Sequence, residues 1–206
     1  MARYTGPKGR INRRLQTQVY ESNGAIKALN HEKRGKQPPG MHIRFRRPST
    51  YGTALMEKQK IKHFYGLGER QLRRYFDRAT QMKGDTGENL LLMCENRLDN
   101  VVRRVGFCRT RPQARQGIAH GHFLVNGIKV DKPSYQLRPG DIITLRAREN
   151  VLKMYQRIRE QGIDGEGLEW VSFDTDKLVA TVSGKPSPSD ISLPVDANTV
   201  VEFLSR

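Results

Sequence analysis

The chain has 206 residues, enough for one compact unit or two small ones, and a formal net charge of +16 from 37 basic and 21 acidic side chains. No apolar run is long enough to span a bilayer, and the start lacks the charged-then-apolar pattern of a secretion signal, so we expect a cytoplasmic protein. The two cysteines, Cys94 and Cys108, exclude a disulfide framework and are interpreted as buried, reduced thiols.

The charge changes sign along the chain. Residues 1–90 hold 20 basic and 7 acidic side chains, residues 91–160 hold 14 and 6, and residues 161–206 hold 3 and 8. This asymmetry predicts that the first three quarters bind a polyanion and that the last segment faces solvent or another protein. The alternative is a soluble basic protein without a nucleic-acid partner.

Residues 1–50 contain Gly6-Pro7, Pro38-Pro39-Gly40 and Pro48 but few apolar side chains. Burial of so little apolar surface does not offset chain entropy, so we expect a basic extended arm that is mobile when free and ordered against phosphates when bound. The alternative is a disordered leader without a role. The candidate RNA-binding residues of the arm are Arg3, Arg10, Arg13, Arg14, Arg44, Arg46 and Arg47.

Residues 51–95 are predicted to form a helical N-terminal domain. One helix runs over about residues 53–65, with Lys58 and Lys62 on one side, and a second over about residues 68–83. The expected apolar stripe of the second helix is Leu72, Tyr75, Phe76, Ala79 and Met82. On its opposite side the candidate RNA-binding residues are Arg70, Arg74 and Arg78. Like charges at this spacing cost about 0.2–0.5 kcal/mol per pair in an isolated helix, and a phosphate partner would reverse that sign.

Residues 96–160 are predicted to form an RNA-binding module that begins with a helix pair. The first helix, residues 97–105, has an apolar stripe made of Leu98, Val101, Val102 and Val105. Arg97, Asn100 and Arg104 lie on another face of it. Thr110-Arg-Pro-Gln113 opens the second helix as a capping box, in which the Thr110 hydroxyl accepts the Gln113 amide and the Gln113 side chain reaches back. In that helix Ala114 and Ile118 are expected inside, with Arg111 and Arg115 outside.

A β-hairpin follows the helix pair, with strands on either side of an Asn126-Gly127 turn within residues 123–130. A strand at 142–145, a helix at 149–161 and strands near 169–173, 178–182 and 200–204 complete the pattern. The predicted class is therefore α+β, with a small, mostly antiparallel sheet. The expected divisions are 1–50 (arm), 51–95 (helical domain), 96–160 (module) and 161–206 (acidic, strand-rich segment).

Arginine suits RNA recognition because its planar fork donates two parallel hydrogen bonds to a phosphate and also stacks on bases. The candidate RNA-binding residues of the module are Arg97, Arg104, Arg109, Arg111, Arg115, Gln116, His120, Lys129, Lys132 and Tyr135. His120 is equally well interpreted as a capped surface histidine. Tyr135 either stacks on a base or closes the hairpin over the core.

Several motifs carry a family resemblance. Arg97-Leu-Asp-Asn-Val-Val102, Ala114-Arg-Gln116, Val125-Asn-Gly127, Pro133-Ser-Tyr135 and Pro139-Gly-Asp141 resemble the small RNA-binding module named after ribosomal protein four of the small subunit. The flanks are similar to the bacterial family of that ribosomal protein in the segments 1–7, 51–52, 57–60, 65–66, 69–71, 84–90 and 201–206. Some relatives bind zinc through N-terminal cysteines. This chain has no cysteine before Cys94, so it resembles the zinc-free form, and we expect no metal or cofactor.

The resemblance implies direct, early binding to small-subunit ribosomal RNA at a multi-helix junction, as a primary assembly protein that nucleates the body of the subunit. It also implies contact with ribosomal protein five and other small-subunit proteins, a role in translational accuracy through that contact, and a position at the messenger RNA entry path. In some bacteria the relative represses its own operon. We place the protein contact in the acidic segment 161–206. An organellar rather than bacterial origin stays open, and neither a membrane nor a small-molecule substrate is expected.

Two other classes compete with a ribosomal protein. Arg97-Leu98-Asp99 matches the Arg-Leu-Asp triplet of pseudouridine synthases, in which the aspartate is the nucleophile. Here the chain continues as a helix, where a carboxylate near the start favours the helix dipole, so Asp99 is interpreted as structural and the chain as no enzyme. A free-standing RNA-binding factor with the same module would lack the basic arm and the two preceding helices.

Overall fold

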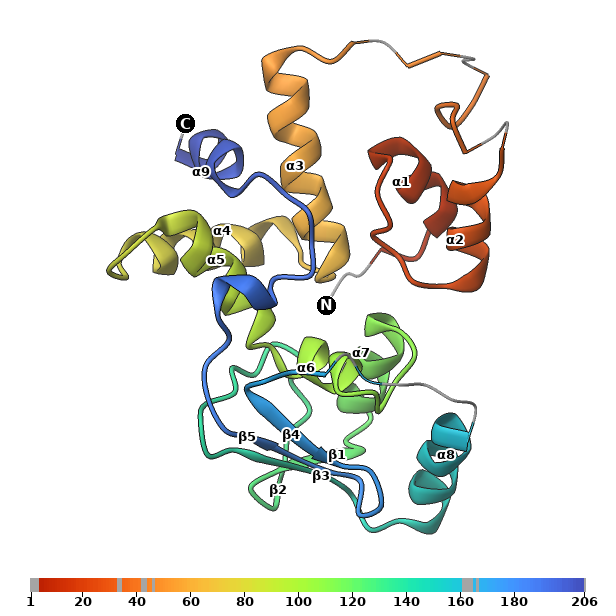
Figure 1. The fold of residues 1–206 in the computed structure, drawn as a ribbon, viewed down its shortest axis with the longest axis vertical. Helices are drawn as coiled ribbons and strands as arrows, with labels where there is room; N and C mark the ends of the chain where they lie inside the picture. The colour runs from red at the N-terminus through yellow and green to blue at the C-terminus, as the bar shows by residue number, and fades with distance from the viewer. Residues whose placement is uncertain are drawn as a thin grey trace. The chain divides into compact units, whose positions relative to one another are not determined.

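The computed structural model describes residues 4–32, 35–41, 44–45, 47–160, 165 and 167–205. The chain divides into two compact units (Figure 1). The first unit comprises residues 1–91 and 192–206, and the second comprises residues 92–191. Helices make up most of the first unit and a sheet with helices makes up the second, which confirms the α+β class.

The expected extended arm is wrong over two stretches, because α1 (Lys8–Leu15) and α2 (Asn23–Asn30) are helices that pack on each other. The buried side chain of Asn12 explains how so polar a segment folds. Its Nδ2 donates to the carbonyl of Tyr20 at 3.0 Å, and its Oδ1 accepts from the backbone N–H of Tyr20 at 2.9 Å. One amide thus satisfies the backbone of the connection, while Leu15 and Val19 are buried beside it.

The remaining helices of the first unit are α3 (Thr50–Phe64), α4 (Glu69–Thr80), most of α5 (Thr86–Glu95) and α9 (Ala197–Ser205). The expected strand near residues 200–204 is therefore wrong. Val200 and Leu204, four residues apart, are buried, and α9 packs on α3. The apolar stripe of α4 is buried as predicted except for Met82, which follows the end of the helix and is exposed.

In the second unit, α6 (Leu98–Arg104) buries its predicted apolar stripe and α7 (Arg111–Ala119) buries Ala114 and Ile118. The sheet has the order β2-β1-β3-β5-β4, and every neighbouring pair is antiparallel. Its strands are β1 (Phe123–Val125), β2 (Ile128–Lys129), β3 (Ile142–Leu145), β4 (Val171–Asp174) and β5 (Val179–Val182). The Asn126-Gly127 turn is confirmed, with φ of 51° and 77°, the left-handed values that a two-residue type I′ hairpin requires.

The core of the second unit lies between one face of the sheet and its helices (Figure 1). Phe107 contacts the rings of Phe123 and Phe173, with centroids 5.5 and 4.8 Å away, and Tyr155 of α8 (Glu149–Glu160) covers Phe123 at 5.3 Å. The short helix η1 (Pro188–Asp190) follows the last strand.

Both cysteines are buried and free, as expected. Burial raises the pKa of each thiol, that of Cys108 to about 12. None of the helices in the described ranges has the length and apolar character needed to cross a membrane.

Candidate RNA interface

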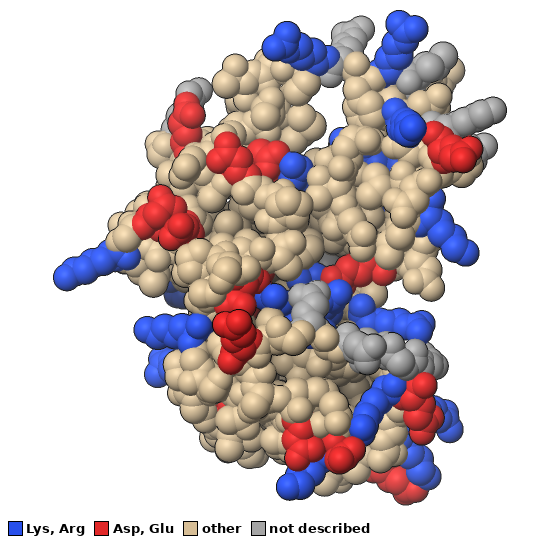
Figure 2. All heavy atoms as spheres, in the orientation of Figure 1, with Lys and Arg blue, Asp and Glu red and all other residues tan. Residues whose placement is uncertain are grey.

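The outer side of α4 is a regular basic surface of the first unit. Arg70, Arg74 and Arg78 are exposed along it, as the spacing predicted, and Arg73 is exposed beside them. Leu72 and Ala79, on the opposite side of α4, are fully buried, so the helix cannot rotate without losing its core contacts. The buried side therefore fixes the face of α4 on which these four arginines lie, and we call this face the α4 surface. Figure 2 shows lysine and arginine side chains projecting from each of the two units.

The two candidate lysines of α3 have an acidic partner within the protein. The ammonium groups of Lys58 and Lys62 lie 3.3 and 3.1 Å from the same carboxylate oxygen of Glu69. Burial opposes ionisation of Glu69, but the two lysines outweigh it and hold the pKa of that carboxyl below its usual value. A phosphate that binds these lysines therefore competes with Glu69.

The arginines of residues 4–50 divide between exposed and structural positions. Arg10 and Arg14 on α1 are exposed, as are Arg44 and Arg47 before α3. Arg13 instead donates to the carbonyls of Gln37 and Pro38, each at 3.1 Å. The candidates Arg3 and Arg46 lie outside the described residues.

The expectation that Arg97 points outward is wrong, because its side chain is fully buried. Nε and Nη2 donate to the two carboxylate oxygens of Asp99 at 2.9 and 2.6 Å, which is a bidentate pair. Arg115 of α7 approaches the same carboxylate at 3.7 Å and keeps only 12% of its side chain exposed. Asp99 therefore ties the start of α6 to α7.

A second buried network holds Arg104 and Arg111, which were also expected outside. Arg104 donates to the carboxylate of Glu95 at 2.9 Å and to the carbonyl of Asp190 at 2.7 Å. Arg111 donates from Nε to Oδ1 of Asn100 at 2.8 Å. The exposed fractions are 5% for Arg104 and 7% for Arg111. These guanidinium groups therefore stabilise the interior of the module.

The remaining candidates of the module lie at its surface. Arg109, Gln116, His120, Lys129 and Lys132 are exposed, and Tyr135 is 37% exposed. The capping box of α7 is confirmed in one half only. Thr110 Oγ1 accepts from the backbone N–H of Gln113, but the Gln113 side chain accepts from the N–H of Arg109, one residue before the expected partner.

Sequence reasoning did not select several exposed basic residues, among them Arg73, Arg138 and Arg148. Arg73 has the helical spacing of the α4 surface, and that signal was available in the sequence. Arg138 and Arg148 follow no repeat, because they belong to irregular connections on either side of β3. Only the folded sheet places them at the surface.

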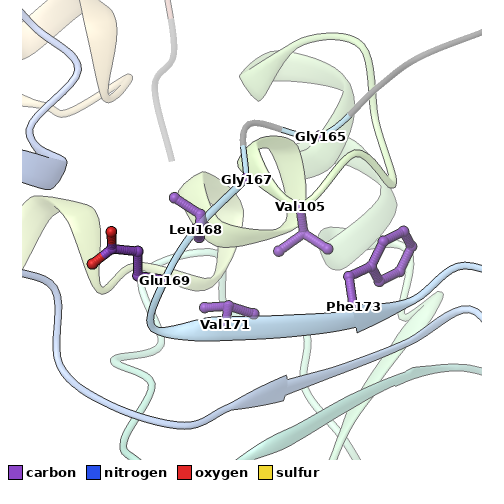
Figure 3. Close-up of a pocket in the computed structure, with 7 residues that line it drawn as sticks. All are labelled: Val105, Gly165, Gly167, Leu168, Glu169, Val171 and Phe173. Atoms are coloured by element: carbon purple, nitrogen blue, oxygen red, sulfur yellow. The ribbon is translucent and has the colours of Figure 1, made fainter.

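One hollow in the second unit is lined mostly by apolar side chains, including Val105, Leu168, Val171 and Phe173 (Figure 3). Among the described residues that line it, the charged one is Glu169, whose carboxylate points away from Val105 and Phe173. Such a lining does not suit a phosphate. Within the described part of the chain, no group of three or more histidine, cysteine, aspartate or glutamate side chains is arranged to hold a metal ion.

Asp99 is the residue on which an RNA-modifying activity would depend. It is 4% exposed, and its carboxylate accepts both bonds of Arg97. A nucleophile must reach its substrate, whereas this carboxylate holds the helix pair together.

The chain matches known proteins over its whole length. Residues 3–95 match the family model described as the ribosomal protein S4/S9 N-terminal domain, and residues 96–143 match the S4 domain. The small ribosomal subunit protein uS4 of Rhodopirellula baltica is 66% identical over 206 residues, with both chains covered completely. Those of Pseudomonas aeruginosa and Pseudothermotoga lettingae are 43% and 44% identical, also over the full length of both chains.

The fold and the matched module define an α+β protein that carries an S4 domain. The chain belongs to the family of small ribosomal subunit protein uS4. Since members of this family are ribosomal proteins, the chain is a protein of translation and not an enzyme, as the sequence indicated.

Proposed function

We propose that this chain is a structural constituent of the small ribosomal subunit that binds small-subunit ribosomal RNA directly, as a primary assembly protein. The observation that carries the proposal is the α4 surface. Four exposed arginines lie along one helix whose other side is buried. Its acidic residues are Glu69, which pairs with Lys58 and Lys62, and Asp77. Phosphates are the partners that turn such a repulsive row into a favourable one.

The buried networks of the S4 domain support direct binding by an already folded protein. Because Arg97, Arg104 and Arg111 are held by Asp99, Glu95 and Asn100, the helix pair keeps its shape before RNA arrives. A surface that is organised in advance loses less conformational entropy on binding. This supports a protein that binds early and nucleates assembly of the subunit body around itself.

The contact with ribosomal protein five is a second part of the proposal, and α9 supports its location. Phe203 on α9 lies against Tyr51 of α3, with ring centroids 5.3 Å apart, and Tyr51 is 64% exposed. An exposed aromatic ring beside an acidic group, here Tyr51 and Glu202, suits a protein partner better than a polyanion. Through this contact we infer a role in translational accuracy.

The proposed locations follow from membership of the subunit. We infer that the chain lies in the cytoplasm, within the small ribosomal subunit, and that it lines the messenger RNA entry path. The exposed Arg44 and Arg47 support a messenger contact because they stand before α3, outside the helix core.

The test of direct binding uses the full chain and protein-free small-subunit ribosomal RNA. We expect a stable complex in sedimentation, and protection of a compact set of RNA helices from hydroxyl-radical cleavage. A chain that joins the RNA only after other ribosomal proteins are bound would show that it is not a primary binder.

A further inference from the structure

A cluster of nitrogen-bearing side chains gathers where α7 meets β1. The histidine–lysine cluster, as we define it, consists of Gln116, His120, His122 and Lys129. The Gln116 amide hydrogen-bonds Nε2 of His120, and the rings of His120 and His122 are 5.8 Å apart in an edge-to-face arrangement. Three residues of the cluster were expected from the sequence to bind RNA. The fourth, His122, was not among the candidates.

Gly121, the residue between the two histidines, allows Lys129 to approach the backbone closely. Gly121 has φ of +70°, and a Cβ built on it would come within 2.2 Å of Cε of Lys129 and 3.2 Å of its Nζ. The lysine stem therefore lies across Gly121, and its ammonium group lies beside the segment that carries both imidazoles. The positive φ favours glycine at this position.

The other charged and titratable groups around His122 come from three directions. Tyr155 of α8 places its hydroxyl 3.3 Å from Nδ1 of His122 and also hydrogen-bonds the thiol of Cys108. Arg148 acts on His122 from the connection after β3, and the backbone N–H of Arg146 donates to the carbonyl of His122 at 2.7 Å. Glu149, which follows Arg148 in the chain, forms an ion pair with Lys153.

These neighbours disfavour a charged imidazole. Burial lowers the pKa of His122 below its usual value, and His120 and Arg148 lower it further. At neutral pH the free protein therefore holds His122 neutral. An anion placed between the imidazoles and the lysine reverses this balance, because an opposite charge within about 4–6 Å favours the protonated form.

We propose that the histidine–lysine cluster binds a phosphate of ribosomal RNA and that this binding takes up a proton on His122. The inference deepens the proposed function and rests on it. The Gln116 amide hydrogen-bonds His120 and keeps that ring beside His122. The affinity for RNA therefore increases as the pH falls from about 8 toward 6, by up to about tenfold per pH unit for one proton.

The experiment measures binding of the full chain to protein-free small-subunit ribosomal RNA at several pH values between 6 and 8. Calorimetry in two buffers of different ionisation enthalpy gives the number of protons taken up. We expect uptake by the wild-type chain and a loss of most of it in the double variant His120→Gln and His122→Gln. Glutamine keeps a polar group beside Tyr155, and circular dichroism of the variant checks its fold.

The matched control is His31→Gln, which removes a histidine at the end of α2, outside the candidate site. It should bind RNA with wild-type affinity and proton uptake. Equal proton uptake by the wild-type chain and the double variant would overturn the inference, as would wild-type binding without any uptake. Absence of RNA binding at every pH would instead overturn the proposed function itself.

Discussion

Individual arginines in this chain serve two different purposes. Arg70 and Arg74 are exposed on α4 and are available to a phosphate, whereas Arg97 and Arg104 are buried against carboxylates. A buried guanidinium is stabilised by charge-assisted hydrogen bonds, and the bidentate pair of Arg97 with Asp99 supplies two of them.

Substitution of Asp99 tests this structural assignment. Asp99→Ala removes the partner of a fully buried guanidinium, so the free energy of unfolding should fall by about 3–5 kcal/mol. Urea denaturation followed by tryptophan fluorescence measures the change. Glu149→Ala is the control, because its ion pair with Lys153 is exposed, and its effect should be much smaller. Similar effects of the two substitutions would contradict the structural role of Asp99.

Residue burial was the least predictable property of the candidate site. The spacing of Leu98 and Val101 identifies the buried stripe of α6, because the pattern is local. The burial of Arg104 depends on the carbonyl of Asp190, 86 residues further along the chain. No helical period contains that information, so the sequence indicated an outward arginine where the fold buries one.

The α4 helix is the element on which RNA binding should depend most simply. Its helical form and both of its sides were predictable, since the apolar and basic residues repeat at a spacing of three and four. The strand expected at α9 was wrong for a related reason. A short apolar run such as residues 200–204 fits a strand or a buried helix equally well, and only its packing on α3 decides between them.

The double variant Arg74→Ala and Arg78→Ala should weaken binding to ribosomal RNA and leave the fold intact. Each lost phosphate contact lowers the slope of log affinity against log salt by about 0.7–0.9, depending on whether the RNA strand is single or paired. Filter binding at several salt concentrations measures the slope. Lys177→Ala with Lys185→Ala removes the same charge from the second unit and should leave the slope unchanged. An unchanged slope in the α4 variant would place the phosphates elsewhere.

At the scale of the whole molecule, each of the two units has its own core. Val101 lies in the core of the second unit and Val200 in that of the first, both without exposed surface. The single tryptophan, Trp170, is buried in the second unit and reports on that unit alone.

We therefore expect separate unfolding transitions. Val101→Asp and Val200→Asp each bury an unpaired charge and should destabilise one unit by several kcal/mol, on the order of 2–5. Val101→Asp should lower the midpoint of the fluorescence transition. Val200→Asp should leave that transition in place and lower only part of the circular dichroism signal. If Val200→Asp shifts the fluorescence midpoint equally, the units unfold together.

Because α9 packs on α3 but is translated after the second unit, the first unit cannot complete its packing until synthesis ends. The 100 residues of the second unit are translated between the helices of the first unit and the segment that completes them. At about 5–20 residues per second this interval lasts about 5–20 s, during which the side of α3 that packs on α9 stays uncovered on the nascent chain. The part of the protein that leaves the ribosome first is thus among the last to reach its native packing.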